Sequence, residues 1–464
     1  MSDTDPALMT AETLLGLYAR RALSPVEALQ AVTERVARLN PWVNAFACMN
    51  PRSHIAAGES AQRWAAGRPI GLLDGVPTTV KDLVNMAGLP TRRGSRTTDA
   101  TPATEDAPLV MGLKAEGAVI IGKTTTTEFG WKTPGDCPLH GITRNPWNRD
   151  RTPGGSSAGA GAAGAASFGP LHLGTDAGGS IRIPAAWCGL VGVKPSFGRI
   201  PQWPHGAFSG VACAGPMTRT VRDAALMMSA MARFDARDPY ALPDDRRDWR
   251  DGIEQGVAGL RVALVRNLGF AAPLDAEGED ALVAAARMLE AQGAIVEEAD
   301  PGLPDTSAIF GRVWGVALSR LVASTPPEKR ALLDAGIEEV ARRQDDMPAT
   351  DFLGAEMLRI EAAHIMARFH QRYDLILTAS TPTAAIGADQ PTIRAWEALW
   401  RDWAPWTFAF NLTRQPAITV PVGLDEAGMP RGVQVAAALY RDDLAFRAAR
   451  AIEVAASVAT AAPV

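Results

Sequence analysis

Two serines in this sequence each follow a pair of glycines, a pattern that could support nucleophilic catalysis. The sequence reads Gly-Gly-Ser at Ser156 and again at Ser180, and no charged residue lies between Ser156 and Asp176. Glycine lets the backbone approach a bound atom closely, so residues 176–180 would offer several consecutive N–H groups around one point. Such amides can stabilise an oxyanion, and a serine at the end of the turn is placed to attack a carbonyl held there.

A nucleophilic serine needs a base, and the composition points to a lysine. Only six of the 46 basic residues are lysines. Arginine keeps its proton in proteins, whereas a desolvated lysine can be neutral. Lys81 lies at the predicted end of a strand in "GVPTTVKD", where sites form in parallel α/β sheets. If histidine is not the base, Lys81 is therefore the candidate for that role. The six histidines leave a Ser-His-Asp triad open, although no Gly-x-Ser-x-Gly elbow marks one.

Short apolar strands alternate with helical patterns, which predicts an α/β fold with a largely parallel, buried sheet. Further strands are predicted at 119–121, 260–265, 374–379, 416–423 and 432–438. A capping box at Ser24–Glu27 begins a helix that we expect to end at Asn40–Pro41. The run 154–169 is too apolar for a solvated linker and predicts a helix whose small residues let other backbone approach.

Several other classes of function are disfavoured by the sequence. Residues 117–124 match the phosphate-binding pattern G-x-x-x-x-G-K-T, but their apolar middle predicts a strand and turn. No paired metal-ligand or Cys-x-x-Cys spacing occurs, so we expect no metal and reduced thiols. A net charge of -5 without a basic run makes nucleic acid an unexpected partner. Neither a signal peptide nor a membrane span is predicted, which favours a cytoplasmic protein.

Seven motifs together resemble the amidase signature family over most of the chain. They are "GVPTTVKDL" (75–83), "TTTTEFG" (124–130), "NPWN" (145–148), "RTPGGSSAGAGAA" (151–163), "GTDAGGSIRIPAAWCGLVGVKPSFGRIP" (174–201), "GPMTRTVRDAA" (215–225) and "FNLTRQPAITVPVG" (410–423). The resemblance implies a single large α/β domain, with a mixed, mostly parallel sheet covered on both faces by helices. Within it, 1–70 would be an N-terminal helical segment, 71–225 the core with the catalytic residues, and 226–464 the remainder with variable pocket loops.

The same resemblance gives the residues their roles. Ser180 is the nucleophile, Ser156 is a relay serine joined to Gly155 by a cis peptide, and Lys81 is the base. The amides of the oxyanion hole belong to Ala177, Gly178, Gly179 and Ser180. The residues that brace this loop are Asp176, Arg182 and Ser157. No cofactor or metal is implied. Ala158 stands where the family usually has glycine, a modest change that leaves the Ser-Ser-Lys triad intact.

The resemblance implies hydrolysis of a carboxylic amide C–N bond through an acyl-serine intermediate, a chemistry that also serves carbamates and esters. Aromatic residues in the variable regions favour an apolar or aryl amide as the small-molecule substrate. The residues expected to line the pocket are Phe129, Gly130, Trp131, Trp203, Trp314 and Trp403.

Two alternatives remain open at this point. The chain could be the ammonia-liberating component of a tRNA-dependent glutamine amidotransferase, which needs partner chains, or a non-catalytic binding module. The second is the weaker alternative, because Lys81, Ser156 and Ser180 are all present. The family also makes a homodimer plausible as the assembly.

Overall fold

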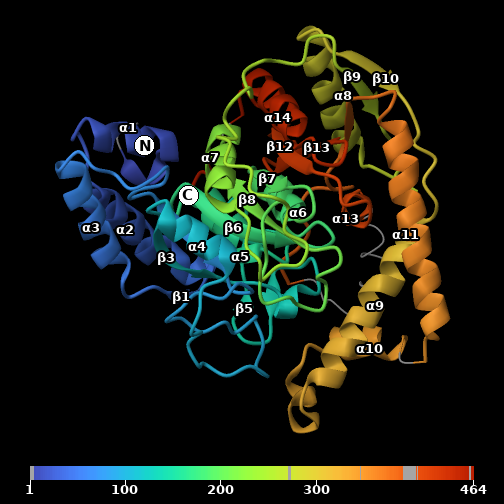
Figure 1. Ribbon diagram of the computed structural model, residues 1–464, viewed down its shortest axis with the longest axis horizontal. Helices are drawn as coiled ribbons and strands as arrows, with labels where there is room; N and C mark the ends of the chain where they lie inside the picture. Colours follow the sequence, from blue (N-terminus) through green and yellow to red (C-terminus); the bar gives the residue numbers. More distant parts are fainter. Residues whose placement is uncertain (1–4, 270–272, 345, 390–403, 405, 459–460) are drawn as a thin grey trace.

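An 11-stranded sheet forms the centre of the protein in the computed structural model (Figure 1). The structure describes residues 5–269, 273–344, 346–389, 404, 406–458 and 461–464. In spatial order the strands are β1 (Phe46–Met49), β3 (Val119–Thr124), β2 (Pro77–Lys81), β6 (Leu171–Asp176), β8 (Cys213–Thr218), β7 (Val191–Lys194), β12 (Ala417–Leu424), β13 (Pro430–Ala437), β11 (Leu375–Ala379), β9 (Arg261–Leu264) and β10 (Ile295–Glu298). A separate pair joins β4 (Asp136–Cys137) to β5 (Gly141–Ile142).

The sheet is mixed, and its parallel pairs form two blocks. One block is β3, β2 and β6, and the other is β11, β9 and β10. Antiparallel strands β8, β7, β12 and β13 connect the two blocks, and β1 adds antiparallel to β3. Because β2 and β6 are parallel neighbours, Lys81 and Asp176 both end their strands at the same edge of the sheet. The predicted α/β fold with a mixed sheet is confirmed.

Helices cover both faces of the sheet (Figure 1). Side chains alternate along each strand, so Val80 and Ile120 face one layer while Val119 and Ile121 face the other. The first layer contains α4 (Pro108–Ala115), α7 (Val221–Met231), α8 (Ala276–Ala291) and α14 (Asp442–Ala456). The second contains α2 (Pro25–Val43), α3 (Ser53–Ala65), α5 (Ala158–Ala165), α6 (Arg182–Cys188), α11 (Ala349–Phe369) and α13 (Phe408–Leu412).

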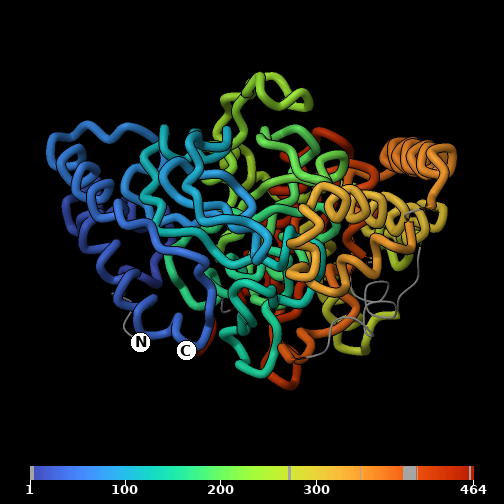
Figure 2. Tube along the Cα trace, turned by 90° about the horizontal axis from the view of Figure 1, so that it is seen from below, coloured from blue at the N-terminus to red at the C-terminus, as the bar shows by residue number. Residues whose placement is uncertain are grey.

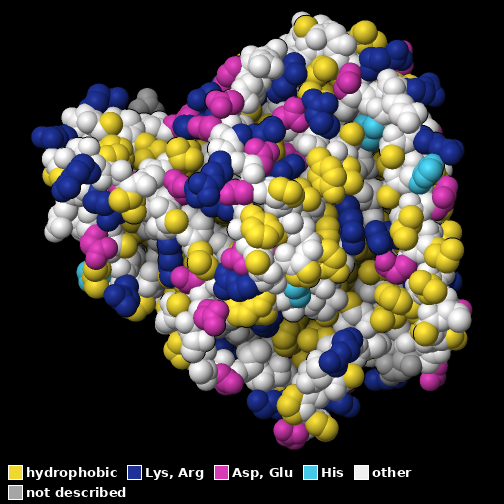
Figure 3. All heavy atoms as spheres, viewed as in Figure 1, with side chains coloured by type: hydrophobic (Ala, Val, Ile, Leu, Met, Phe, Trp, Pro, Cys, Tyr) yellow, Lys and Arg dark blue, Asp and Glu magenta, His cyan; other side chains and the backbone are white. Residues whose placement is uncertain are grey.

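The remaining helices of the described residues complete the fold. They are η1 (Pro6–Leu8), α1 (Ala11–Ala19), η2 (Glu128–Gly130), α9 (Thr306–Ser324), η3 (Pro327–Leu332) and α10 (Ala335–Arg342). The N-terminal helices gather at one end, and α9, α10 and α11 gather at the other (Figure 2). On the face shown in Figure 3, acidic and basic side chains are interspersed. Among the described residues, none of the helices combines the length and hydropathy needed to cross a bilayer.

The Ala/Gly-rich run forms the buried helix α5, as predicted, and it packs backbone against backbone. Every residue of α5 is buried. The amide of Gly159 donates to the carbonyl of Thr125, at 3.1 Å. A Cβ on Gly159 would lie 2.3 Å from the carbonyl oxygen of Ala45, so no larger residue fits. This contact fixes the start of α5, and therefore the residues just before it, against the end of β3.

The predicted end of helix α2 is wrong. The helix continues through Pro41 to Val43, and Asn44 then adopts the left-handed conformation with φ 54°. Pro41 lies in the last turn, where the missing N–H removes only one helical hydrogen bond. The side chain of Asn40 accepts a hydrogen bond from the amide of Ala45 at 2.7 Å, which stabilises this ending.

Candidate active site

Lys81 is the centre of a buried cluster of hydroxyl groups. It is the last residue of β2, and its side chain is fully buried. Its Nζ lies 2.7 Å from Ser156 Oγ, 2.9 Å from Ser157 Oγ and 2.9 Å from Thr175 Oγ1. Burial lowers the pKa of Lys81 well below its ordinary value, and the charge of Asp176 only partly opposes this shift. The position therefore favours a neutral amine.

The hydrogen bonds around Lys81 allow its amine to accept a hydrogen bond from Ser156. The hydroxyl of Ser157 donates to the carbonyl of Thr175 at 3.2 Å, so its oxygen accepts from Lys81. A neutral amine has two N–H donors and one lone pair. If the donors bind Ser157 and Thr175, the lone pair faces the hydroxyl of Ser156. In this arrangement Lys81 can take a proton from Ser156.

The two glycine–serine loops meet beside this cluster. The Gly155–Ser156 peptide is cis in the structure. The next residue, Ser157, precedes α5, and its amide donates to the carbonyl of Ser180 at 3.2 Å. This bond joins the loop before α5 to the loop before α6. The serines predicted as relay and nucleophile therefore lie on directly connected segments.

A buried ion pair holds the second loop. Arg182 binds both carboxylate oxygens of Asp176, through Nε at 2.9 Å and Nη2 at 3.0 Å. The side chain of Asn411 donates to Asp176 Oδ1 at 3.0 Å. Burial alone would raise the pKa of Asp176, but the charge and hydrogen bonds of Arg182 outweigh it and hold this pKa below its usual range. The carboxylate is thus ionised and can organise the loop around it.

The loop 177–180 presents its amides beside this carboxylate. Gly179 already donates its amide to Asp176 Oδ1 at 2.8 Å. Among the described residues, the amides of Ala177, Gly178 and Ser180 have no protein acceptor. Gly179 has φ 128°, and a Cβ there would lie 2.3 Å from Thr407 Oγ1. Gly179 therefore serves mainly to shape the turn, whereas the other three amides are available to a ligand.

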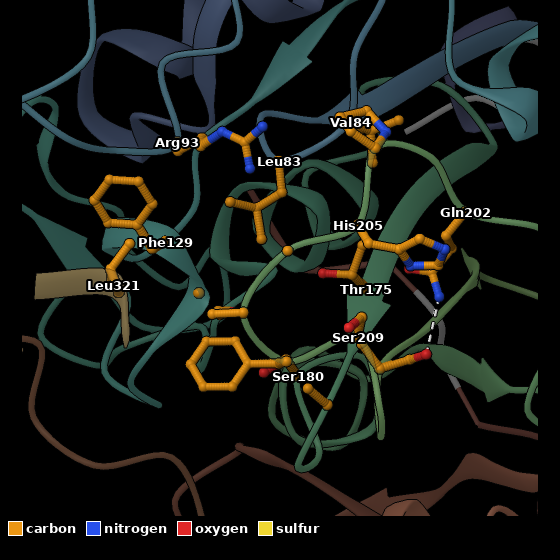
Figure 4. Close-up of a pocket in the computed structure, with 18 of the residues that line it drawn as sticks. Leu83, Val84, Arg93, Phe129, Thr175, Ser180, Gln202, His205, Ser209 and Leu321 are labelled. Atoms are coloured by element: carbon orange, nitrogen blue, oxygen red, sulfur yellow. Dashed lines mark hydrogen bonds between the residues drawn. The ribbon is translucent and has the colours of Figure 1, made fainter. Parts of the chain in front are cut away.

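A cavity of about 470 Å³ opens at the two serines (Figure 4). Ser156 and Ser180 both line it, and so do Phe129, Gly130 and Trp203. Its volume lies within the usual range for small-molecule sites. The candidate nucleophile and the candidate relay therefore line the same cavity.

Comparison with known proteins identifies the family. The family model described as Amidase matches residues 27–445. The chain belongs to the amidase signature family. An acylamidase from Rhodococcus erythropolis is 35% identical and the alignment covers 98% of this chain and 96% of that protein. A glutamyl-tRNA(Gln) amidotransferase chain from Geobacter metallireducens is 31% identical, with 94% of each chain covered.

Solved structures of amidase signature enzymes have the same fold. A bacterial aryl acylamidase of the family superposes with a TM-score of 0.88 at 28% identity, covering 96% of each chain. The 6-aminohexanoate cyclic dimer hydrolase complexed with substrate gives 0.89 at 29% identity, covering 99% of each chain. This chain is thus a hydrolase of amide C–N bonds by family.

Two of the predicted pocket residues of this amidase, Trp131 and Trp314, are not among the residues that line the cavity. Trp131 and Trp314 are buried and lie behind the wall. Trp314 stacks on Phe208, a lining residue, with ring centroids 3.8 Å apart, and its Nε1 donates to the carbonyl of Trp131 at 3.2 Å. These tryptophans are core residues that support the aromatic wall. Trp403 lies outside the described residues.

The histidines of this amidase form no hydrogen bond with Ser156 or Ser180 among the described residues. His205 lines the cavity, and its Nε2 lies 3.2 Å from Asp238. His172 is buried beside Thr79, and burial lowers its pKa to about 3. In the part of the chain that the structure describes, no cluster of residues could hold a metal ion. The Ser-His-Asp alternative requires a serine hydroxyl that donates to a histidine nitrogen, and no such hydrogen bond is present among the described residues.

Two residues of the site are not among the residues predicted from the sequence. Thr175 contributes a hydroxyl to Lys81, and Arg93 lines the cavity. Thr175 precedes Asp176 on β6, so its position at the end of a strand could have identified it from the sequence. Arg93 carries no comparable signal, because the chain contains 40 arginines among its 46 basic residues.

Replacing Arg182 with methionine is expected to lower the free energy of unfolding by about 3–5 kcal/mol. The change leaves the Asp176 carboxylate buried without its cation, and breaking a buried pair has an effect of this size. Denaturant unfolding measures it. As a matched control, Arg246→Met removes an exposed partner of Asp244 and should leave the free energy of unfolding nearly unchanged. Equal effects of the two substitutions would contradict the structural role assigned to Arg182.

Proposed function

We propose that this amidase cleaves carboxylic amides through an acyl-enzyme on Ser180, with Ser156 as relay and Lys81 as base. The observation that carries the proposal is the 2.7 Å contact of Lys81 Nζ with Ser156 Oγ, beside a cavity that Ser156 and Ser180 both line. The other members of this cluster, Ser157 and Thr175, hold the amine in position.

The reaction follows from the proton path. Lys81 accepts a proton from Ser156 while Ser156 takes the proton of Ser180, and Ser180 Oγ attacks the amide carbonyl. The amides of Ala177, Gly178 and Ser180, which have no protein acceptor among the described residues, are available to the developing oxyanion. Ser156 then passes a proton to the departing amine. Water attacks the acyl-Ser180 ester through the same proton path, which releases the acid and restores the serine.

The proposed substrate is an apolar or aryl amide, with carbamates and esters as further substrates. The cavity wall includes Phe129, Trp203 and Phe208, which offer flat apolar surfaces. The names of three similar proteins support this choice. They are an acylamidase at 35% identity, an aryl acylamidase of known structure, and an indoleacetamide hydrolase at 34% identity.

A role in a glutamine amidotransferase is the less favoured function for this site. Recognition of free glutamine would call for a carboxylate that binds the α-ammonium group. Among the described residues that line the cavity, none is aspartate or glutamate.

We also propose a cytoplasmic location, because the four cysteines are free. For the assembly we propose the homodimer that the family makes plausible.

The proposal is tested with the isolated full-length chain. A fluorophosphonate should add one adduct by intact mass, and peptide mapping should place it on Ser180. The same preparation should hydrolyse a short panel of anilides, 4-nitrophenyl carbamates and primary amides, with glutamine as the poorest substrate. Labelling at another residue, or release of ammonia from glutamine alone, would overturn the proposed mechanism or the proposed substrate class respectively.

A further inference from the structure

The cavity of the proposed active site is positively charged. Arg93 and Arg320 belong to its lining, and no acidic residue does among the described lining residues. Arg320 lies on α9 and is exposed, so it forms part of the rim. Arg93 is half-buried and extends toward the cavity beside Leu83 (Figure 4).

The backbone holds Arg93 firmly in an uncommon conformation. Its φ is 53°, in the left-handed region that few non-glycine residues adopt. The amide of Arg93 donates to the carbonyl of Asp82 at 3.1 Å, and its carbonyl accepts from the amide of Phe129 at 2.8 Å. Two neighbouring segments therefore fix the point from which the side chain leaves the backbone.

The guanidinium of Arg93 donates to no protein group among the described residues, unlike that of its neighbour. Arg92 donates from Nε to Thr98 Oγ1 at 3.2 Å and does not line this cavity. The charge of Asp82 acts on Arg93, but Asp82 is fully buried and its Oδ1 already pairs with Lys123 at 2.8 Å. One carboxylate thus serves two cations, and among the described residues Arg93 forms no ion pair of its own.

We propose that Arg93 binds a carboxylate of the substrate, so that the amide carries an acidic group away from the scissile bond. Arginine suits this task, because its planar donors match a carboxylate in a bidentate pair. Figure 4 shows Arg93 across the cavity from Ser180, so one ligand could reach both. The same cavity offers no described carboxylate for an ammonium group, which favours N-acyl or aryl amides of acids over free amino acids.

Burial is consistent with an anionic ligand at this position. It lowers the pKa of Arg93, and the charge of Asp82 opposes the shift. A partly desolvated cation gains from a bound anion more than an exposed one does, because the local dielectric is lower. This inference rests on the proposed function, since it names the substrate class of the same site.

The test uses two matched pairs of anilides. Glutaryl-4-nitroanilide and hexanoyl-4-nitroanilide place the carboxylate or its neutral counterpart on the acyl side. 3-Carboxyacetanilide and 3-methylacetanilide carry the carboxylate, or the methyl group that replaces it, on the amine side. For at least one pair, Arg93→Gln should lower kcat/KM of the carboxylated member by about 10- to 100-fold, mainly through KM, and change the neutral member by less than about twofold.

Two further variants separate charge recognition from structure. Arg92→Gln removes the adjacent guanidinium and should leave both members of each pair unchanged. Arg93→Lys keeps a point charge without the bidentate geometry and should recover part of the loss. Equal losses for carboxylated and neutral substrates in Arg93→Gln, or no loss in either pair, would overturn the proposal.

Binding measurements distinguish a failure of the proposed role of Arg93 from a failure of the proposed catalytic function. If the wild-type chain hydrolyses neither pair and Ser180 takes no label, the proposed function fails. Titration calorimetry with both pairs on the wild-type and Arg93→Gln proteins still tests the inference. Weaker binding of a carboxylated member to the variant, with equal binding of its neutral counterpart, supports the role of Arg93, whereas equal binding of all four compounds to the two proteins refutes it.

Discussion

Replacing Ser180 with alanine should lower kcat for amide hydrolysis by about 10⁴- to 10⁶-fold. Removing the nucleophile of a serine hydrolase has an effect of this size, because the remaining oxyanion stabilisation and binding give only residual catalysis. The change should be tolerated by the fold. The contact of Ser180 that joins the two loops uses its carbonyl, which accepts from the amide of Ser157, and alanine keeps that carbonyl.

The measurement is single-turnover hydrolysis of an anilide together with fluorophosphonate labelling. The Ser180→Ala protein should take no label and should keep the unfolding midpoint of the wild type. Ser457→Ala, a change at an exposed residue after α14, is the matched serine control and should leave kcat unchanged. Substantial activity in Ser180→Ala would mean that another group attacks the carbonyl.

The second large effect is expected at Lys81. Lys81→Met keeps an unbranched side chain of similar length and removes the amine, so kcat should fall by about 10²- to 10⁴-fold, the usual contribution of a general base. Lys114→Met is the matched control, because Lys114 is partly exposed and pairs with Asp106 away from the cavity. The control should retain wild-type kcat.

The pH profile identifies the base more sharply than the rate alone. The active form of Lys81 is the neutral amine, and burial lowers its pKa. The kcat/KM of the wild type should therefore rise as pH increases through this lowered pKa, and reach its plateau below the ordinary lysine pKa of about 10.4. Glu128, whose pKa burial raises to about 7, also titrates in the accessible range. Only the limb that belongs to Lys81 should disappear in Lys81→Met. A profile with the same limb in both proteins would exclude Lys81 as the base.

Stability should also depend on pH through Lys81. Below the ordinary lysine pKa, the unfolded chain binds a proton at Lys81 that the folded protein binds less readily. Unfolding therefore takes up a proton, and the free energy of unfolding of the wild type decreases as pH falls at this site. Methionine has no such proton, so Lys81→Met should be at least as stable as the wild type near neutral pH. Denaturant unfolding at two pH values measures this.

Much of the candidate site could be predicted from the sequence, because its groups follow short local signals. Lys81 closes a strand, and Ser156 and Ser180 follow glycine pairs, so strand ends and tight turns place them without knowledge of the packing. In the structure Lys81 contacts Ser156, and Ser156 and Ser180 line the same cavity. It also confirms the buried helix of small residues and the α/β fold.

The remaining features depend on contacts that are distant in sequence. Trp131 and Trp314 touch each other although 183 positions separate them, and nothing local distinguishes such core residues from lining residues. Arg93 differs from its neighbour Arg92 only in what surrounds each guanidinium. Helix α2 passes Pro41 because a proline in the last turn disrupts little, whereas sequence rules treat the residue before proline as a helix end.

The reactive groups and the walls of the cavity come from different parts of the chain. The serines and the lysine come from strand ends and turns between 81 and 180, whereas much of the wall comes from the loop 202–209 and from α9. Substitutions in those two wall segments can reshape the cavity without changing a single hydrogen bond of Lys81. Laboratory evolution toward new amides could therefore confine its library to these segments and leave the reactive groups as they are. The two properties, rate of acyl transfer and choice of substrate, would then vary as nearly independent traits.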